Sequence, residues 1–195
     1  MILPIIAYGD PVLRKVGVDI DKDYPELDAL IENMRETMVN ASGVGLAAPQ
    51  IGKAIRLFII NATPFSEDED LEKEEREFLS QFNKVFINAK IIKEEGNDWV
   101  FNEGCLSIPD IREDVFRQEK VTIEYLDEKF EKHTDVIEGI AARIVQHEYD
   151  HIEGILFTDL ISTLKKRLIK KKLENISKGK VNPDYRMKFP LLKRK

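Results

Sequence analysis

Apolar side chains recur along three segments of the chain at the spacing of an amphipathic helix. The first predicted helix, Pro25–Ala41, has one apolar stripe with members three or four positions apart, namely Leu27, Leu30, Ile31, Met34 and Met38. The second, about Glu138–Ile152, carries enough apolar residues to be largely buried, and Gly154 is expected to end it. The third, Leu160–Ile176, alternates leucine and isoleucine with lysine, which predicts a basic amphipathic helix.

Strand patterns lie between the first and second predicted helices. Ile55–Asn61 reads as a mostly buried strand, and Val85–Glu94 resumes a strand pattern. Lys120–Leu126 alternates with a period of two, as Phe130–Ile137 does more weakly, and the residues between them predict a hairpin. Two segments lack such patterns. Residues 1–24 are punctuated by glycine and proline and predict an irregular arm, whereas residues 62–82 are rich in acids and predict a solvated insertion.

Composition sets bounds on the class of protein. The chain has 195 residues, of which 43% are hydrophobic, which suits one folded domain with a substantial core. No apolar run reaches the roughly 18 residues of a membrane span, and the first residues lack the pattern of a secretion signal. We therefore expect a cytoplasmic protein without membrane association. Cys105 is the only cysteine, which excludes an internal disulfide.

The net charge of −6 conceals an asymmetry. Residues 165–195 contain 13 Lys and Arg against 2 Asp and Glu, whereas the other 164 residues contain 17 against 34. We expect residues 1–164 to form the main domain, and residues 165–195 to add a basic helix and tail to the same unit. The tail could bind ribosomal RNA electrostatically or could simply be a solvated face that neutralises the acidic body.

Two of the three histidines lie on the second predicted helix with a carboxylate beside them. Helical residues advance about 100° each, so His147 and His151 share one face, flanked by Glu148. Two imidazoles on one helix face can bind a metal ion while a carboxylate reaches water. A third ligand is needed, and the sequence leaves two sources for it: a downstream carboxylate, or Cys105 upstream.

Two further segments are unusual. Ser42–Gly52 has three glycines among small residues, which indicates a tight backbone, but it lacks the Lys-Ser/Thr of a phosphate-binding loop. Trp99–Pro109 holds the single cysteine directly after a glycine. Taken alone, the first segment could be a helix cap and the cysteine a small buried hydrophobe.

Taken together, three motifs resemble those of the peptide deformylase family, which removes the formyl group from new bacterial polypeptides. The glycine motif G-x-G-L-A-A-x-Q stands at Gly43–Gln50, E-G-C-x-S at Glu103–Ser107 and H-E-x-D-H at His147–His151. The resemblance covers about residues 1–160, and the tail matches loosely. With the predicted elements it implies an α+β fold, in which antiparallel or mixed sheets pack around a central metal-binding helix, with an N-terminal helix and a C-terminal basic helix.

The resemblance also implies roles for individual residues. Cys105, His147 and His151 would bind one divalent metal, with Fe(II) as the physiological ion and Zn(II) or Ni(II) as substitutes. Glu148 would act first as general base and then as general acid. The side-chain amide of Gln50 and the backbone N–H of Leu106 would stabilise the oxyanion.

The same resemblance implies the residues that bind the formyl-methionyl chain. Gly45 would pair with the substrate backbone, as an added strand does. The methionine pocket would be lined by Val44, Ile140 and Ile144. Arg143 falls on the same face, and we expect its stem to pack there while its guanidinium reaches Glu103 or solvent. The substrate-binding set is thus Val44, Gly45, Glu103, Ile140, Arg143 and Ile144, and an ion pair between Arg117 and Asp150 is expected to hold the helix in place.

Two other functions fit parts of the sequence. A zinc peptidase could use the H-E-x-x-H motif, but it would need neither Gln50 nor a cysteine ligand. A non-catalytic protein that binds the ribosome or RNA would account for the basic tail alone. Cleavage of formyl-Met peptides, compared with cleavage of internal peptide bonds, distinguishes the two enzymes.

Overall fold

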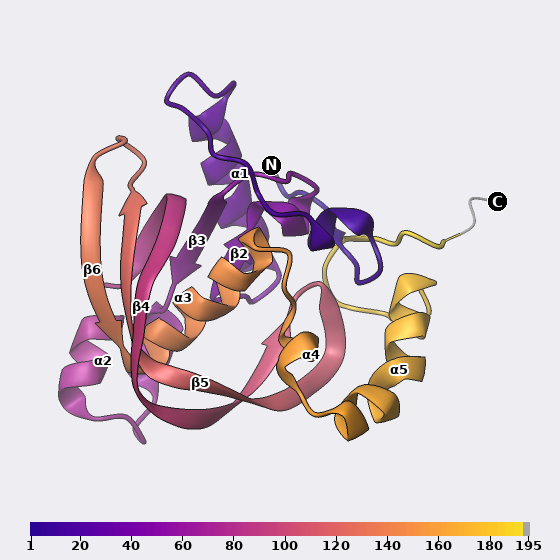
Figure 1. Cartoon of the computed structure of the whole chain (residues 1–195). Helices are drawn as coiled ribbons and strands as arrows, with labels where there is room; N and C mark the ends of the chain where they lie inside the picture. Colours follow the sequence, from indigo (N-terminus) through magenta and orange to yellow (C-terminus); the bar gives the residue numbers. More distant parts are fainter. Residues whose placement is uncertain (193–195) are drawn as a thin grey trace.

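A five-stranded antiparallel sheet forms the body of the computed structural model, which describes residues 1–192 (Figure 1). Its strand order is β2-β3-β4-β5-β6, so each strand pairs with its neighbour in sequence. The bounds are Gly45–Ala47 for β2, Leu57–Asn61 for β3, Asn83–Cys105 for β4, Ile108–Leu126 for β5 and Lys132–Glu138 for β6. The predicted α+β class with antiparallel strands is confirmed.

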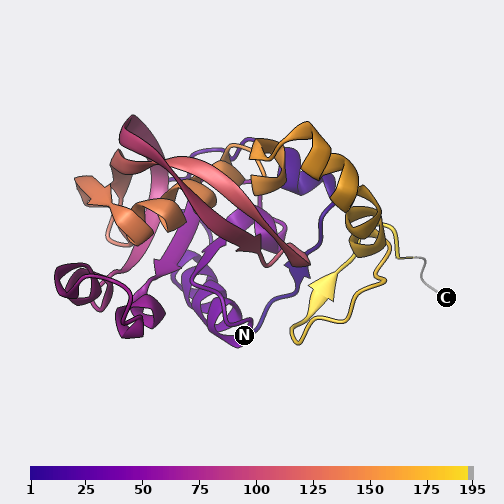
Figure 2. The ribbon, with the colours of Figure 1, turned by 90° about the horizontal axis from the view of Figure 1, so that it is seen from below.

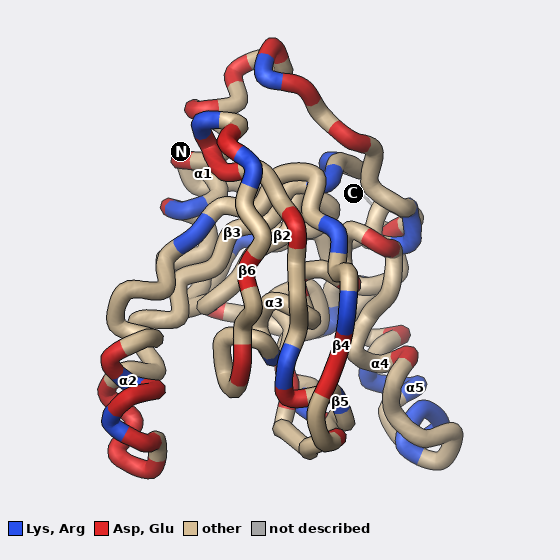
Figure 3. Tube along the Cα trace, turned by 60° about the vertical axis from the view of Figure 1, so that its left-hand side comes forward, with Lys and Arg blue, Asp and Glu red and all other residues tan. Residues whose placement is uncertain are grey.

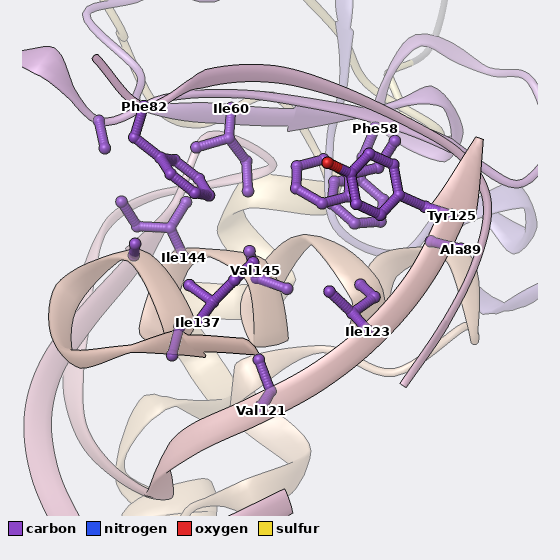
Figure 4. Packing of buried hydrophobic residues seen from close by; sticks show 14 of the residues in the cluster. Phe58, Ile60, Phe82, Ala89, Val121, Ile123, Tyr125, Ile137, Ile144 and Val145 are labelled. Carbon is purple, nitrogen blue, oxygen red and sulfur yellow. The ribbon is translucent and has the colours of Figure 1, made fainter. Parts of the chain in front are cut away.

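The helix that carries both histidines, α3 (Gly139–Ile152), packs across this sheet (Figure 1). Ile144 and Val145 of α3 face buried residues of several strands, including Phe58, Ile60 and Ile123 (Figure 4). Burying apolar area in this way contributes roughly 25 cal/mol per Å². The position of α3 is therefore fixed by the core, which in turn fixes the side chains on its other face.

A second helix, α1 (Leu27–Asn40), covers another part of the sheet. Its stripe, which includes Leu30, Met34 and Met38, lies in a separate buried cluster with Leu57 and Ile87 of the sheet. The helix begins two residues later than predicted. The prediction of an N-terminal helix is otherwise confirmed.

Strands β4 and β5 are much longer than the sequence indicated. The predicted strands Val85–Glu94 and Lys120–Leu126 are only the inner parts of a pair that extends to Cys105 and starts again at Ile108. Most of residues 92–100 are exposed, so they carry no alternating apolar pattern. Backbone hydrogen bonds between the two strands hold this part together, interrupted by bulges.

The acidic segment 62–82 is more structured than expected. It contains a 3₁₀ helix, η3 (Thr63–Glu67), and a short helix, α2 (Lys73–Leu79). Leu79 and Phe82 are fully buried against the main core, which corrects the prediction of a purely solvated insertion. Glu75 accepts a hydrogen bond from the backbone N of Ile140 at 2.9 Å. The segment therefore caps the N-terminus of α3.

The C-terminal part consists of two helices and a returning segment. The predicted helix Leu160–Ile176 corresponds to α5 (Thr163–Ser177), which begins three residues later because Ser162 caps it by accepting from the N of Lys165 at 3.3 Å. A separate short helix, α4 (Phe157–Leu160), precedes it. A two-residue strand, β7 (Met187–Lys188), then pairs in parallel with β1 (Ile5–Ile6). The last three residues of the predicted basic tail, 193–195, lie outside the described residues.

None of the helices within residues 1–192 combines the length and the apolar character needed to cross a membrane.

Candidate active site

Three potential metal ligands converge where α3 meets the end of the β4–β5 pair. His147 and His151 lie on α3, and Cys105 is the last residue of β4. Their ligand atoms all lie within 4.8 Å of one another, and the Cys105 Sγ is 3.3 Å from the His151 Nε2. One sulfur and two imidazole nitrogens at this spacing suit a tetrahedral ion that keeps one position open.

Neighbouring groups set the state of each imidazole. The Nδ1 of His147 bonds to Glu103 Oε2 at 3.0 Å, which leaves its Nε2 available as a ligand. Burial lowers the pKa of His151 well below its usual value and favours the neutral, ligating form. Burial also lowers the pKa of His147, but hydrogen bonds to Cys105 and Glu103 outweigh it and raise the pKa overall. Because the raised pKa favours protonated His147, a metal ion would have to displace a proton from this imidazole, and metal binding should therefore depend on pH.

Glu148 lies beside these ligands and is almost fully buried. Its Oε2 has no hydrogen-bond partner among the described residues. Burial, the largest influence, raises the pKa of Glu148 to about 7, although the positive charge of His147 opposes it. Gly45 packs directly against this carboxylate, because a Cβ on Gly45 would lie 2.7 Å from the Cγ and Cδ of Glu148. An unpartnered carboxyl with a pKa near neutrality can both accept and donate a proton.

A buried ion network supports the site from behind. Arg117 donates from Nε and Nη2 to Glu103 at 2.7 and 3.1 Å, and from Nη1 to Asp150 Oδ2 at 2.7 Å. The structure thus contains the predicted ion pair between Arg117 and Asp150. Burial raises the pKa of Glu103, but bonds from His147 and Arg117 hold it well below its usual range. Glu103 is therefore charged and keeps His147 in one orientation.

This network also occupies the carboxylate of Glu103, which is expected to belong to the substrate-binding set. Arg143 Nη1 adds a fourth hydrogen bond to the Glu103 carboxylate, at 3.0 Å. Both carboxylate oxygens are occupied by protein donors, although the residue lines the cleft. Arg143 itself is 2% exposed, and its guanidinium also donates to the carbonyl of Trp99 at 2.7 Å. Of the two destinations expected for this guanidinium, it reaches Glu103 rather than solvent.

The glycine segment brings a side-chain amide close to the candidate metal ligands. The Oε1 of Gln50 accepts from the backbone N of Ala47 at 2.8 Å, which fixes the orientation of the amide. Its Nε2 then points toward Cys105 Sγ at 3.5 Å and Ser107 Oγ at 3.4 Å. Gln50 and the Cys105–Ser107 turn therefore form one edge of the same small space.

A cleft of about 700 Å³ opens in front of these residues. Val44, Gly45, Arg143 and Ile144 of the predicted substrate-binding set line it, together with the candidate catalytic residues Gln50, Leu106 and Glu148. Ile140 is not among the residues that line it, although this side chain is buried in the same apolar cluster as Ile144. Ile140 is excluded because the apolar face of α3 extends beyond the opening of the cleft, so that only some of its residues reach the cleft.

Sequence reasoning missed several residues that line the cleft. Phe65 comes from the acidic segment, Phe101 from the unpredicted part of β4, and residues 182–185 from the C-terminal tail. Aromatic residues within an acidic run and within a strand gave a weak signal for the first two. Nothing in the composition of the basic tail indicated that it returns to the site.

Comparison with known proteins gives a consistent result. A family model described as polypeptide deformylase matches residues 2–167. The peptide deformylases of Christiangramia forsetii and Flavobacterium johnsoniae are each 64% identical over 194 residues, which cover all of this chain and 99% of each relative.

Solved structures agree with the sequence relatives. The crystal structure of a peptide deformylase from Legionella pneumophila has a TM-score of 0.76 and 36% identity, and the match covers 92% of this chain and 98% of that one. A peptide deformylase from Plasmodium falciparum, in complex with an inhibitor, has a TM-score of 0.74 and 30% identity over 88% and 97% of the two chains. These matches favour neither a general zinc peptidase nor a non-catalytic RNA-binding protein. The chain belongs to the polypeptide deformylase family.

Proposed function

We propose that Cys105, His147 and His151 hold one divalent metal ion and that Glu148, Gln50 and Leu106 carry out deformylation around it. As a member of this family, the chain is an enzyme that removes the formyl group from newly made polypeptides. The observation that carries the residue assignment is the convergence of three ligand atoms within 4.8 Å beside an unpartnered buried carboxylate.

The donor set fits the metal that the family requires. A thiolate and two neutral imidazoles accept Fe(II), Zn(II) and Ni(II) alike, and we propose Fe(II) as the physiological ion, with Zn(II) or Ni(II) able to substitute. When bound, the ion supplies a Lewis acid that polarises the formyl carbonyl and acidifies water. The helix α3 would then be the central metal-binding helix of the fold.

Glu148 moves the protons in this scheme. Its buried carboxylate, with a pKa of about 7, takes a proton from the attacking water and later delivers it to the amine that leaves. The absence of a hydrogen-bond partner for Oε2 among the described residues leaves this oxygen free for the exchange.

Gln50 and Leu106 stabilise the charge that develops on the formyl oxygen. The bond from Ala47 to Gln50 Oε1 directs the amide N–H₂ group into the site before substrate arrives. Preorganised donors of this kind are effective because they need no reorientation during the reaction, and loss of one typically costs about 100–1,000-fold in turnover.

The substrate enters alongside β2. This strand is at one edge of the sheet, paired only with β3, so its other edge is available to an extended peptide. Gly45 lies on that strand, and its lack of a side chain leaves room for Glu148. Val44 and Ile144 supply apolar surface for the methionine side chain, and Ile140 belongs to the apolar cluster that they contact.

Release of formate from formyl-Met-Ala-Ser tests the proposal, with protein purified and handled anaerobically. Glu148→Gln should keep its metal and lose at least 100-fold in turnover, because the amide cannot accept the proton. Loss of metal from this variant would instead show that Glu148 has a structural role. Cys105→Ala should lose metal affinity, and a full metal content in that variant would contradict the ligand assignment.

We also propose that the basic segment 165–195 docks the enzyme on ribosomal RNA, near its formylated nascent substrate in the cytoplasm. Lys170, Lys171 and Lys172 of α5 are exposed and form one basic run, whereas acidic residues gather on α2 and elsewhere on the body (Figure 3). Replacing these three lysines with glutamine should weaken co-sedimentation with ribosomes at low salt and reduce its salt dependence. Unchanged co-sedimentation would favour the alternative that this basic segment is only a solvated face of the protein. The division of the chain near residue 164 would then have no functional meaning.

A further inference from the structure

The chain beyond α5 turns back and reaches the active site. Its strand β7 lies beside the N-terminal strand β1 (Figure 2), where the N of Ile5 donates to the carbonyl of Arg186 and the N of Ala7 to that of Lys188, both at 2.9 Å. Met187 and Phe189 pack against the apolar cluster that α5 shares with β5. Residues 182–185 are consequently held against the cleft as part of its wall.

Tyr185 makes a specific contact from this segment. Its hydroxyl donates a hydrogen bond to the backbone carbonyl of Leu106 at 2.8 Å. Burial, together with nearby negative charge at Cys105 and Asp110, raises the pKa of Tyr185 above its usual value, so the hydroxyl remains a donor throughout the physiological range. The bond thus joins residues 79 positions apart, one in the tail and one next to a metal ligand.

The contact is significant because the turn after Cys105 is held from several sides. The carbonyl of Ser107 accepts from the N of Tyr8 at 2.8 Å. The side chain of Leu106 lies over Gly43, where an added Cβ would come within 2.7 Å of its Cδ1. With its side chain, its carbonyl and the next carbonyl all fixed, Leu106 can present its N–H in only a narrow range of directions.

We propose that Tyr185 is a positioning residue of the deformylase site, which holds the Leu106 carbonyl so that the Leu106 N–H points at the developing oxyanion. The inference rests on the oxyanion role proposed above for Leu106. It makes the C-terminal tail a working part of the active site, in addition to any part that its charge has in docking.

Tyr185→Phe removes the hydroxyl and keeps the ring. The variant should lower kcat for formyl-Met-Ala-Ser about three- to tenfold, the range expected for one net hydrogen bond. KM should change little because the contact acts on the transition state rather than on bound substrate. Metal content and Tm should match those of the parent enzyme. Phe189→Leu is the matched control, because it loosens packing in the same tail without touching the turn.

The outcomes separate this inference from the proposed function. An unchanged kcat in Tyr185→Phe overturns the inference, as does a fall that accompanies metal loss, or an equal fall in Phe189→Leu. Gln50→Ala reports on the oxyanion site independently. If Gln50→Ala lowers kcat and Tyr185→Phe does not, the proposed function stands and only the role of Tyr185 fails. If neither variant lowers kcat, the oxyanion assignment itself is wrong.

Discussion

Replacing Arg117 with methionine should destabilise the protein more than removal of any surface ion pair. The Arg117 side chain is 6% exposed, and it donates to both Glu103 and Asp150. Breaking a buried pair by removing one partner typically costs about 3–5 kcal/mol, because a buried charge is left uncompensated. We expect about 3 kcal/mol, the lower end, since Arg143 still donates to Glu103. For a chain of this size, that corresponds to a fall in Tm of about 6–12 °C.

Thermal unfolding with a matched control would measure the effect. Arg35→Met removes an exposed pair with Glu128, and should cost less than about 1 kcal/mol. Adding Asp150→Asn to Arg117→Met should recover part of the lost stability, because it neutralises the stranded carboxylate. Metal affinity of Arg117→Met should fall about 10–100-fold as Glu103 loses its hold on His147. If Arg117→Met were no more destabilising than Arg35→Met, or if Asp150→Asn gave no recovery, the uncompensated charge would not be the cause.

Three further results are expected. Removing the metal with a chelator should lower Tm, by the equivalent of about 2.7 kcal/mol if the metal had been present at 100 times its Kd; an unchanged Tm would mean that the site contributes nothing to folding. Gly45→Ala should lower formate release about 100-fold or more without metal loss, because its Cβ would displace Glu148, and normal release would show that the carboxylate can move freely. Asp135 accepts from Lys84 at 2.6 Å; burial raises its pKa, but this bond outweighs burial and lowers it. Because its pKa is lowered in the folded state, ionised Asp135 stabilises the fold above about pH 4, and this contribution is lost as the pH falls further. In urea unfolding, Asp135→Asn should therefore cost about 1–2 kcal/mol of stability at pH 7 and progressively less below pH 4. A cost independent of pH would refute this explanation.

Elements with a buried apolar face were predictable from the sequence, and elements held by backbone pairing were not. The helices α1 and α3 were located to within two residues because their stripes match the helical period. The outer halves of β4 and β5 were missed because most side chains there are exposed. These segments are held in place by backbone hydrogen bonds between the two strands, and such bonds impose no pattern on the side chains.

The candidate site was predictable where a motif fixes the chemistry. The motifs predict Cys105, His147 and His151 as metal ligands, and the structure brings their ligand atoms within 4.8 Å of one another. The destination of the Glu103 carboxylate was not predictable, since a charged residue beside a cleft could face either substrate or protein. The position of Tyr185 could not be predicted from the sequence either, because nothing in the sequence of the basic tail indicates which distant residue Tyr185 contacts.

The distances along the chain between the groups of the site have a consequence for folding. Gln50, Cys105, His147 and Tyr185 come from four separate parts of the sequence, and the sheet, the packing of α3 and the return of the tail to β1 together bring them to one site. Contacts between residues this far apart in sequence carry the entropic cost of closing long loops. The candidate metal ligands lie on β4 and α3, whereas Tyr185 joins the tail to the turn that follows β4. Metal binding should therefore depend only on the folding of the body. Catalytic turnover should depend in addition on the docking of the C-terminal segment, which acts through Leu106.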